Sequence, residues 1–308
     1  MAHTSKLAMR GVALFGASVM ALGLGACSGG KSDSSSGASG GQVTVEMWDY
    51  LSGDTANSSI EASIAEFEKA NPDIKVKRTT FAFADLSKSI LQGSVGGEVP
   101  DVAVVDVVDN QNFASLGMLK DLSGDGINKS DFFDGPWSSV EFDGKTYGIP
   151  LNSNNLALYY NKTMLKEAGV EVPTDWASLK EAAKKTTKGD VKGLAISAVK
   201  NESGTFQLLP FVWQTGGDMS NYSESGATAL AYLRGMIEDG SVSEAVVNYT
   251  QEDARTQFIT GKAAMMINGP WELSTLTKDA EIEWDVAPLP KDKRAATSMG
   301  GENVVVMN

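Results

Sequence analysis

Histidine and cysteine, the side chains most used in nucleophilic catalysis and zinc binding, each occur once in this chain of 308 residues, as His3 and Cys27. Ser-His-Asp and Cys-His catalysis need an imidazole beside the nucleophile, and zinc sites take most of their ligands from His and Cys. His3 lies in an N-terminal segment that we expect to be cleaved, so the mature chain would have no imidazole. The functions that remain open to such a chain are carboxylate chemistry, lysine chemistry, binding of oxygen-ligated metals, and ligand binding without reaction. We expect no metal ion and no cofactor.

Carboxylates and an aromatic side chain stand at the ends of two expected strands. Asp49 and Tyr50 close the first β-branched run, and Asp106 directly follows a continuous apolar run at 102–105. Ligands of open α/β sheets sit beyond the carboxyl ends of the strands, and an unpaired carboxylate is costly to bury. We therefore expect Asp49, Tyr50 and Asp106 to face a ligand. Helix capping is the alternative for Asp106, although Asp109 fits that role better.

The segment before Cys27 has the layout of a secretory signal. Lys6 and Arg10 form a positively charged start, residues 11–24 are apolar, and small residues precede the cysteine. The apolar run is shorter than the roughly 20 residues that a membrane span needs. The segment resembles the lipobox of bacterial lipoproteins, which implies a signal peptide at 1–26 and a membrane anchor through acylated Cys27. A chance match with a buried cysteine is the alternative.

Composition after Cys27 separates a tether from a folded body. Residues 28–41 are almost all Ser and Gly, which predicts a flexible, lipid-anchored tether over 27–42. Roughly 265 residues follow, enough for two domains. The formal net charge of −13 is dispersed, which favours a solubility role and argues against nucleic acid and anionic membrane surfaces as partners.

Strand and helix patterns alternate in the first part of the body, which is typical of an α/β fold. Apolar spacing predicts helices that contain Ile60, Ile64 and Phe67, then Leu86 and Ile90, then Phe113. Strands are predicted at 43–48, from 74, at 102–105, and around 147–150, after a tight turn at Asp143 and Gly144.

The second part of the body continues the α/β pattern. We expect Thr174 to cap a helix and Pro270 to occupy the first position of another. Strands are predicted at 156–160, 193–197 and 263–267, and helices at 206–213, 227–238 and 250–258.

Several blocks of the body match one family in order. The chain resembles the family 1 extracellular solute-binding proteins, which are carbohydrate receptors of ABC importers related to maltose-binding protein. The most specific block is the run at 258–271, FITGKAAMMINGPW. The others lie at 67–72, 97–101, 147–150, 158–162, 213–218 and 300–303.

The resemblance implies a two-lobed periplasmic-binding-protein-like fold of type II, with hinge crossovers and a ligand cleft between the lobes. It divides the body into an N-terminal lobe of 43–152 plus 290–308 and a C-terminal lobe of 153–289. The first crossing is expected near 152–154 and the return near 288–290. Family members continue beyond the Gly-Gly-Glu-Asn strand, so we expect the chain to be C-terminally truncated and its second lobe incomplete.

The resemblance also implies cleft residues. Trp271 would be a plane on which a sugar ring stacks, and Asn154 at the crossing would be a polar ligand contact. Phe206 is a candidate second-lobe aromatic, although its spacing from Trp213 also fits a buried stripe. The returning strand adds the further candidates Gly301, Glu302 and Asn303.

The function implied is that of a monomeric, non-enzymatic receptor that binds a mono- or oligosaccharide outside the cell and delivers it to ABC permease subunits. A glycoside hydrolase that uses two carboxylates is one alternative, because it needs no histidine. A surface adhesin lipoprotein is the other.

Overall fold

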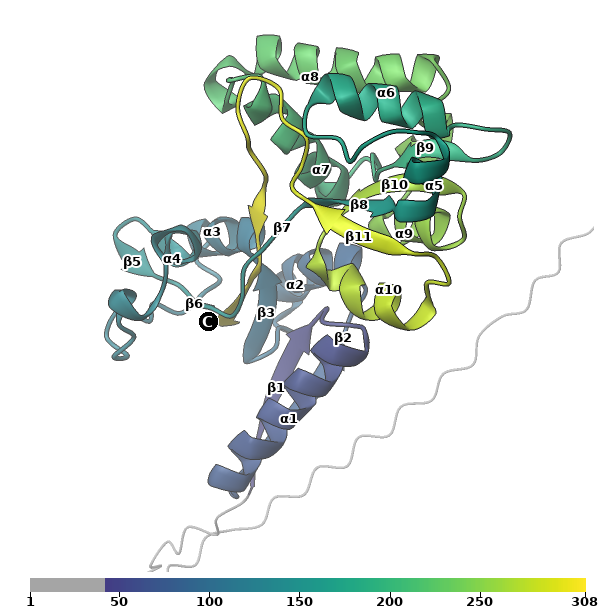
Figure 1. Ribbon diagram of the computed structural model, residues 1–308. Helices are drawn as coiled ribbons and strands as arrows, with labels where there is room; N and C mark the ends of the chain where they lie inside the picture. Colours follow the sequence, from purple (N-terminus) through teal and green to yellow (C-terminus); the bar gives the residue numbers. More distant parts are fainter. Residues whose placement is uncertain (1–41) are drawn as a thin grey trace, which may run out of the picture. The chain divides into compact units, whose positions relative to one another are not determined.

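The computed structural model describes residues 42–308 (Figure 1). The predicted signal peptide, the acylated Cys27 and almost all of the predicted tether lie outside the described residues. Within the described part, no helix combines the length and the apolar character that crossing a bilayer requires.

A five-stranded sheet forms the first lobe, in the order β2-β1-β3-β13-β6. β1 is parallel to β2 and β3, whereas β13 is antiparallel to β3 and β6. The hydrophobic core of the first lobe contains Leu86 and Ile90 of α2, Phe113 of α3, and the buried strand residues Val105 and Val305. The strands are β1 (Val43–Asp49), β2 (Ile74–Thr80), β3 (Val102–Asp106), β6 (Ile149–Pro150) and β13 (Glu302–Val306). The helices are α1 (Asp54–Ala70), α2 (Phe83–Gly96), α3 (Val107–Ser115) and α4 (Asp134–Val140).

A four-stranded sheet in the order β11-β8-β10-β9 forms the second lobe. Every residue of β10 is buried, because helices cover both faces of this strand; this explains its continuous apolar sequence. The strands are β8 (Ala157–Asn161), β9 (Lys192–Ala195), β10 (Ala263–Asn268) and β11 (Trp284–Ala287). The main helices are α5 (Lys162–Glu167), α6 (Trp176–Thr186), α7 (Glu202–Gln214), α8 (Tyr222–Glu238), α9 (Gln251–Ile259) and α10 (Leu273–Asp279).

Two short antiparallel strands connect the lobes. β7 (Asn154–Asn155) lies where the sequence predicts the first crossing, and it pairs with β12 (Met299–Gly300). Gly301 follows with φ of 142°, and a Cβ there would lie 2.4 Å from the carbonyl oxygen of Asn152. Only glycine fits both the backbone conformation and the space at this position.

The return to the first lobe comes later than the predicted 288–290. Between β11 and β12 the chain forms a long loop, yellow in Figure 1. Its residues bond to the second lobe: Lys291 N donates to Thr174 O at 3.1 Å, and Arg294 Nε donates to Trp213 O at 2.6 Å. We therefore propose that the second lobe extends to about residue 298.

Helix caps differ from prediction in two places. Asp106 caps α3 by accepting from Val108 N at 3.0 Å, whereas Asp109, which we expected to fit that role better, accepts from the Ser87 hydroxyl. Asp175 caps α6 in a capping box with Ser178, so the prediction of Thr174 is wrong by one residue. The carboxylate of Asp175 reaches the third backbone N–H of the helix, as a capping box requires.

Replacing Gly301 by alanine should destabilise the protein by about 1–3 kcal/mol, because the new methyl group would meet the Asn152 carbonyl oxygen in a backbone conformation that alanine rarely adopts. Thermal unfolding measures the loss. Gly96→Ala is the matched control, since a Cβ there meets nothing within 4 Å and φ is not positive. Equal melting temperatures of the two variants would contradict the assignment of Gly301 as a crowded crossing residue.

Candidate functional site

A cavity of about 210 Å³ is lined by residues of both lobes. Tyr50, Phe83, Asp106 and Asp109 come from the first lobe, and Glu202 comes from the first turn of α7 in the second lobe. A larger hollow of about 670 Å³ is lined only by side chains of α2. We assign the site to the smaller cavity, because only there do polar groups from distant segments converge.

Three strands bring the polar groups of the first lobe together. Glu302 lies opposite Asp106 in the antiparallel register of β13 and β3. The hydroxyl of Tyr50, just after β1, donates to Glu302 Oε1 at 3.0 Å. The structure therefore brings together Tyr50, Asp106 and Glu302, although the sequence places them far apart.

The acidic side chains of this site are partly removed from water and lie near one another. Burial raises the pKa of Asp106 to about 7; the nearby Glu302 carboxylate adds to this effect, and the hydrogen bond from Val108 N opposes it. Burial, with Asp106 and Asp109 nearby, raises the pKa of Glu202 to about 7. Within residues 42–308, no Lys or Arg forms an ion pair with any of these four carboxylates. A ligand would therefore meet a surface rich in hydrogen-bond acceptors and poor in fixed positive charge.

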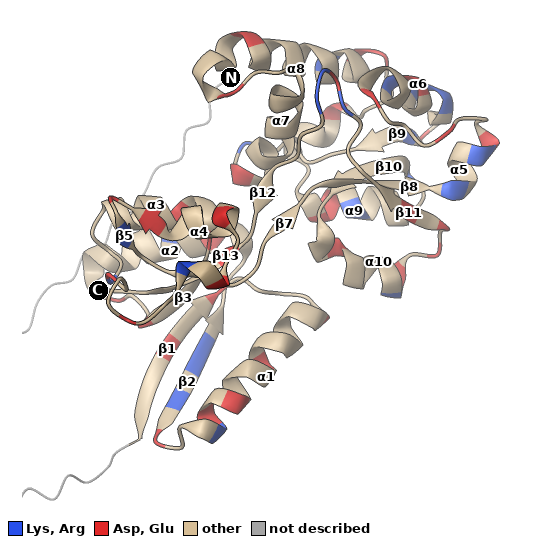
Figure 2. Ribbon diagram, turned by 60° about the vertical axis from the view of Figure 1, so that its left-hand side comes forward, with Lys and Arg blue, Asp and Glu red and all other residues tan. Residues whose placement is uncertain are grey.

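Asp49 does not face the cavity. Its side chain is fully buried, and its two oxygens accept from Arg78, from Nε at 2.5 Å and from Nη2 at 2.8 Å. Arg78 belongs to β2, where Figure 2 shows basic residues in blue beside β1. Tyr50, just after the end of β1, lines the cavity, whereas the Asp49 carboxylate is directed to Arg78 instead. We leave Asp49 out of the ligand set that we propose below.

Arg78 also donates to the carbonyl oxygen of Leu51 at 2.8 Å, and Leu51 N donates to Asp49 at 2.9 Å. The buried ion pair therefore fixes the backbone on both sides of Tyr50. Its role is to position the residue that lines the cavity.

Two aromatic rings of the second lobe lie side by side. Trp271 is 37% exposed and lies in the short helix η4 (Pro270–Glu272), directly after β10. The ring of Phe206 in α7 is half-buried, and its centroid is 6.2 Å from that of Trp271. Phe206 comes one helical turn after Glu202, so α7 presents a carboxylate and an aromatic ring on one face.

Residues of the crossing and of the returning strand have other partners. Asn303 is fully buried and donates to Asn110 Oδ1 at 3.1 Å and to the hydroxyl of Ser139 at 3.0 Å. Gly301 is crowded by Asn152, as described above. Asn154 is half-buried, and its Oδ1 atom is buried without a hydrogen-bond partner in the described part of the chain. Asn303 and Gly301 thus hold the first lobe together, and we leave both out of the ligand set.

Glu202 is not among the residues predicted from sequence, because the predicted helix starts at Phe206, four residues after the true start of α7. The signal was present: Asn201 caps α7, and an acidic residue in the first turn commonly follows such a cap. Phe83 and Asp109 were also missed as cavity residues. They begin α2 and α3, and nothing in the periodicity of either helix indicates which end faces a cavity.

Two α/β lobes joined by paired crossing strands, with a cavity lined from both, define the class of two-lobed type II periplasmic binding proteins. Residues 62–308 match the family of bacterial extracellular solute-binding proteins. The chain belongs to this family.

Relatives and solved structures agree with this assignment. The chain is 28% identical to the maltodextrin-binding protein MdxE of Bacillus subtilis, covering 92% of this chain and 68% of that protein. It is also 28% identical to the maltooligosaccharide ABC transporter solute-binding lipoprotein of Streptococcus pneumoniae, with 97% and 72% covered. The GacH receptor of Streptomyces glaucescens, solved unliganded and with acarbose, is similar with a TM-score of 0.74 and 30% identity over 86% of this chain and 71% of that one. Maltose-bound MalE3 of T. maritima gives a TM-score of 0.77 and 26% identity, with 86% and 72% covered.

Replacing Glu202 by glutamine should change how stability depends on pH. A carboxyl group whose pKa is raised to about 7 on folding binds its proton more tightly in the folded state. Its contribution to stability is therefore present below about pH 4 and is lost as the pH rises through 7. The variant E202Q lacks this titrating group. The difference in free energy of unfolding, E202Q minus wild type, should therefore be larger at pH 8 than at pH 5 by on the order of 1 kcal/mol.

Thermal unfolding at both pH values measures this difference. Glu66→Gln is the control, because Glu66 is exposed on α1. A pH profile of E202Q that overlies that of E66Q would refute the buried, mutually repelling arrangement of the cavity carboxylates.

Proposed function

We propose that this protein is the carbohydrate-binding receptor of an ABC importer. It captures a mono- or oligosaccharide between its lobes and delivers it to the permease subunits. The observation that carries the proposal is the exposed face of α7: Glu202 lines the cavity, and Phe206, one turn later, packs beside the half-exposed indole of Trp271, although neither ring lines the cavity itself. Sugars offer hydroxyl groups, which bind carboxylates, and C–H faces, which pack on aromatic planes.

The ligand set that we propose combines both lobes. Tyr50, Asp106 and Glu302 of the first lobe would bind hydroxyl groups, and Glu202 would do so from the second lobe. Phe206 and Trp271 would pack on the sugar rings, and Asn154 would supply an amide at the crossing. The names of the maltodextrin- and maltooligosaccharide-binding relatives support this ligand class.

Charge favours an uncharged saccharide. Asp106, Asp109, Glu202 and Glu302 lie at or beside the cavity without an ion-pairing cation among the described residues. A sugar phosphate or a uronate would bring a further negative charge into a site where like charges already raise pKa values. The proposed ligand is therefore a neutral mono- or oligosaccharide.

A receptor fits the carboxylates better than a glycoside hydrolase does. Hydrolases of this type need one protonated and one ionised carboxyl group, which requires environments that push two pKa values apart. Here the pKa values of Asp106 and Glu202 are both raised to about 7. We therefore propose that the protein returns its ligand unchanged.

The place of action follows from the family and from the N-terminal sequence. Members of the family are extracellular, so the protein works outside the cytoplasm. We propose that it is held at the outer face of the cell membrane by a lipid on Cys27 and acts as a monomer. The lipoprotein named among the relatives supports the anchor.

Substituting Trp271 by alanine should weaken saccharide binding at least about tenfold, because the loss of a half-exposed indole removes much of the apolar contact with a sugar ring. Glucose, maltose, lactose and maltotriose are screened by differential scanning fluorimetry, and affinity for the strongest is measured by calorimetry. Phe133→Ala is the control, because Phe133 is an exposed aromatic side chain, at 84%, that lies before α4 in the first lobe and has no part in the Phe206–Trp271 pair. Saccharide affinity that is equally reduced in both variants would remove Trp271 from the site.

Anionic sugars and product analysis test the rest of the proposal. Glucose 6-phosphate and glucuronate should bind at least about tenfold more weakly than glucose, because each brings a negative charge to the acidic cavity.

Maltotriose incubated with the protein should be recovered intact by chromatography. Release of maltose and glucose would instead favour the hydrolase, and stabilisation by anionic sugars alone would overturn the neutral-ligand assignment.

A further inference from the structure

We propose that Tyr159 is a positioning residue for Trp271: its hydroxyl holds the turn that presents the indole. This inference rests on the proposed function only for its effect on saccharide affinity. The geometry of the turn can be tested without a ligand.

The hydroxyl of Tyr159 has one partner in this structure. It donates to the carbonyl oxygen of Gly269 at 2.7 Å, and the side chain is only 2% exposed. The ring packs in an apolar cluster that includes Phe258, Met266 and Leu276. A buried hydroxyl must find an acceptor or lose the free energy of its hydration, so this bond restrains both groups that it joins.

Gly269 sets where the indole can lie. A Cβ at Gly269 would come within 2.1 Å of two atoms of the Trp271 ring, so the ring packs directly against this glycine. A shift of the Gly269 backbone would therefore shift the indole with it. The antiparallel pairing of β8 with β10 brings Tyr159 opposite Met266, close to the point where the turn begins.

Both ends of the turn have further buried polar contacts, and one of these contacts links the two ends. Glu272 is 1% exposed and accepts from Arg255 Nη1 at 2.7 Å and from Asn268 Nδ2 at 3.3 Å. Asn268 is fully buried; its Nδ2 donates to Gln251 O at 3.0 Å, and its Oδ1 accepts from Gly269 N at 3.0 Å. Trp271 is thus an exposed side chain on a turn whose two ends are fixed by buried polar contacts. Such an arrangement pre-organises an aromatic surface before a ligand arrives.

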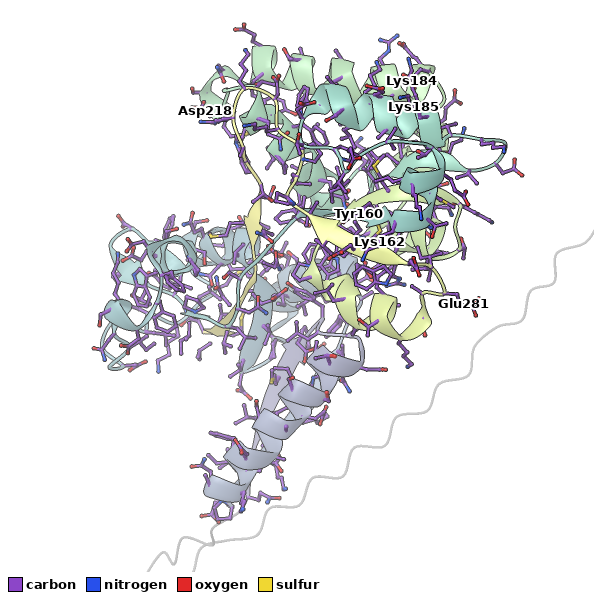
Figure 3. The ribbon with its side chains drawn as sticks, viewed as in Figure 1. Tyr160, Lys162, Lys184, Lys185, Asp218 and Glu281 are labelled. Atoms are coloured by element: carbon purple, nitrogen blue, oxygen red, sulfur yellow. The ribbon has the colours of Figure 1, made fainter. Side chains whose placement is uncertain are left out.

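Tyr160 supplies the matched control. It follows Tyr159 on β8 and packs against the opposite face of the sheet, in the cluster that contains Leu158 and Leu179. Figure 3 labels it beside Lys162 in the second lobe. Tyr159→Phe and Tyr160→Phe remove one hydroxyl each from neighbouring positions of the same strand.

Fluorine NMR of the full chain labelled with 5-fluorotryptophan tests the geometry without a ligand, with Trp271→Phe to assign the resonance. Y159F should shift or broaden the Trp271 resonance and leave those of Trp48 and Trp137 in the first lobe unchanged. Y160F should leave the Trp271 resonance in place. An unmoved Trp271 resonance in Y159F, or the same change in Y160F, would overturn the inference.

A double-mutant cycle is measured on the affinity for the saccharide of the panel that binds most tightly. Y159F alone should weaken binding about 2- to 10-fold, the range expected for one hydrogen bond. In the W271A background it should have no further effect, because Tyr159 acts through the indole. Equal losses in both backgrounds would make Tyr159 a general structural residue. If the wild type binds no saccharide, the proposed function fails, whereas the NMR result still decides the positioning role.

Discussion

β13 pairs antiparallel with β3 over five residue pairs, although one strand belongs to residues 302–306 and the other to 102–106. This pairing closes the first-lobe sheet and sets Glu302 opposite Asp106. It also requires the chain to cross between the lobes twice, and the two crossings pair with each other as β7 and β12. The polar wall of the cavity and the hinge are therefore consequences of one strand register. A shift of that register by one residue would turn Glu302 away from the cavity.

The same register creates an electrostatic cost that the described side chains do not relieve. Asp106 gains one backbone hydrogen bond from its helix cap, and Glu302 gains the hydroxyl of Tyr50, but neither has an ion-pairing cation within residues 42–308. Sugar hydroxyl groups are donors without charge, so they satisfy these oxygens without the desolvation cost of an ionic ligand. Asp106, whose pKa burial raises to about 7, can also hold a proton and donate in turn.

The helices and strands could be predicted from the sequence better than the side-chain contacts between them. Strands β1, β3 and β10 were predicted from their β-branched or continuous apolar runs, whereas the choice of Trp271 came from the family resemblance and not from any local pattern. The role of Asp49 could not be predicted from the sequence, because its partner Arg78 lies on another strand. The pairing of the two strands decides which side chains meet, and no local pattern gives it. Glu202 was missed because the predicted helix began at 206; the Asn201 cap indicates the true start of α7, but no local pattern encodes the approach of α7 to β3 that brings Glu202 to the cavity.

The two sides of the site are prepared for a ligand in different ways. Trp271 stands on a turn fixed at both ends, so the aromatic side is formed in advance. Phe206 instead packs where the lobes join, since a Cβ at Gly300 of β12 would lie 3.0 Å from its ring. One ion pair joins the lobes, between Lys278 Nζ and Asp54 Oδ2 at 2.8 Å, and the two side chains are 67% and 79% exposed. Ion pairs as exposed as this contribute little to stability. A ligand that packs on Phe206 would therefore contact the side chain that lies against the crossing strand, whereas the exposed ion pair adds little to the association of the lobes.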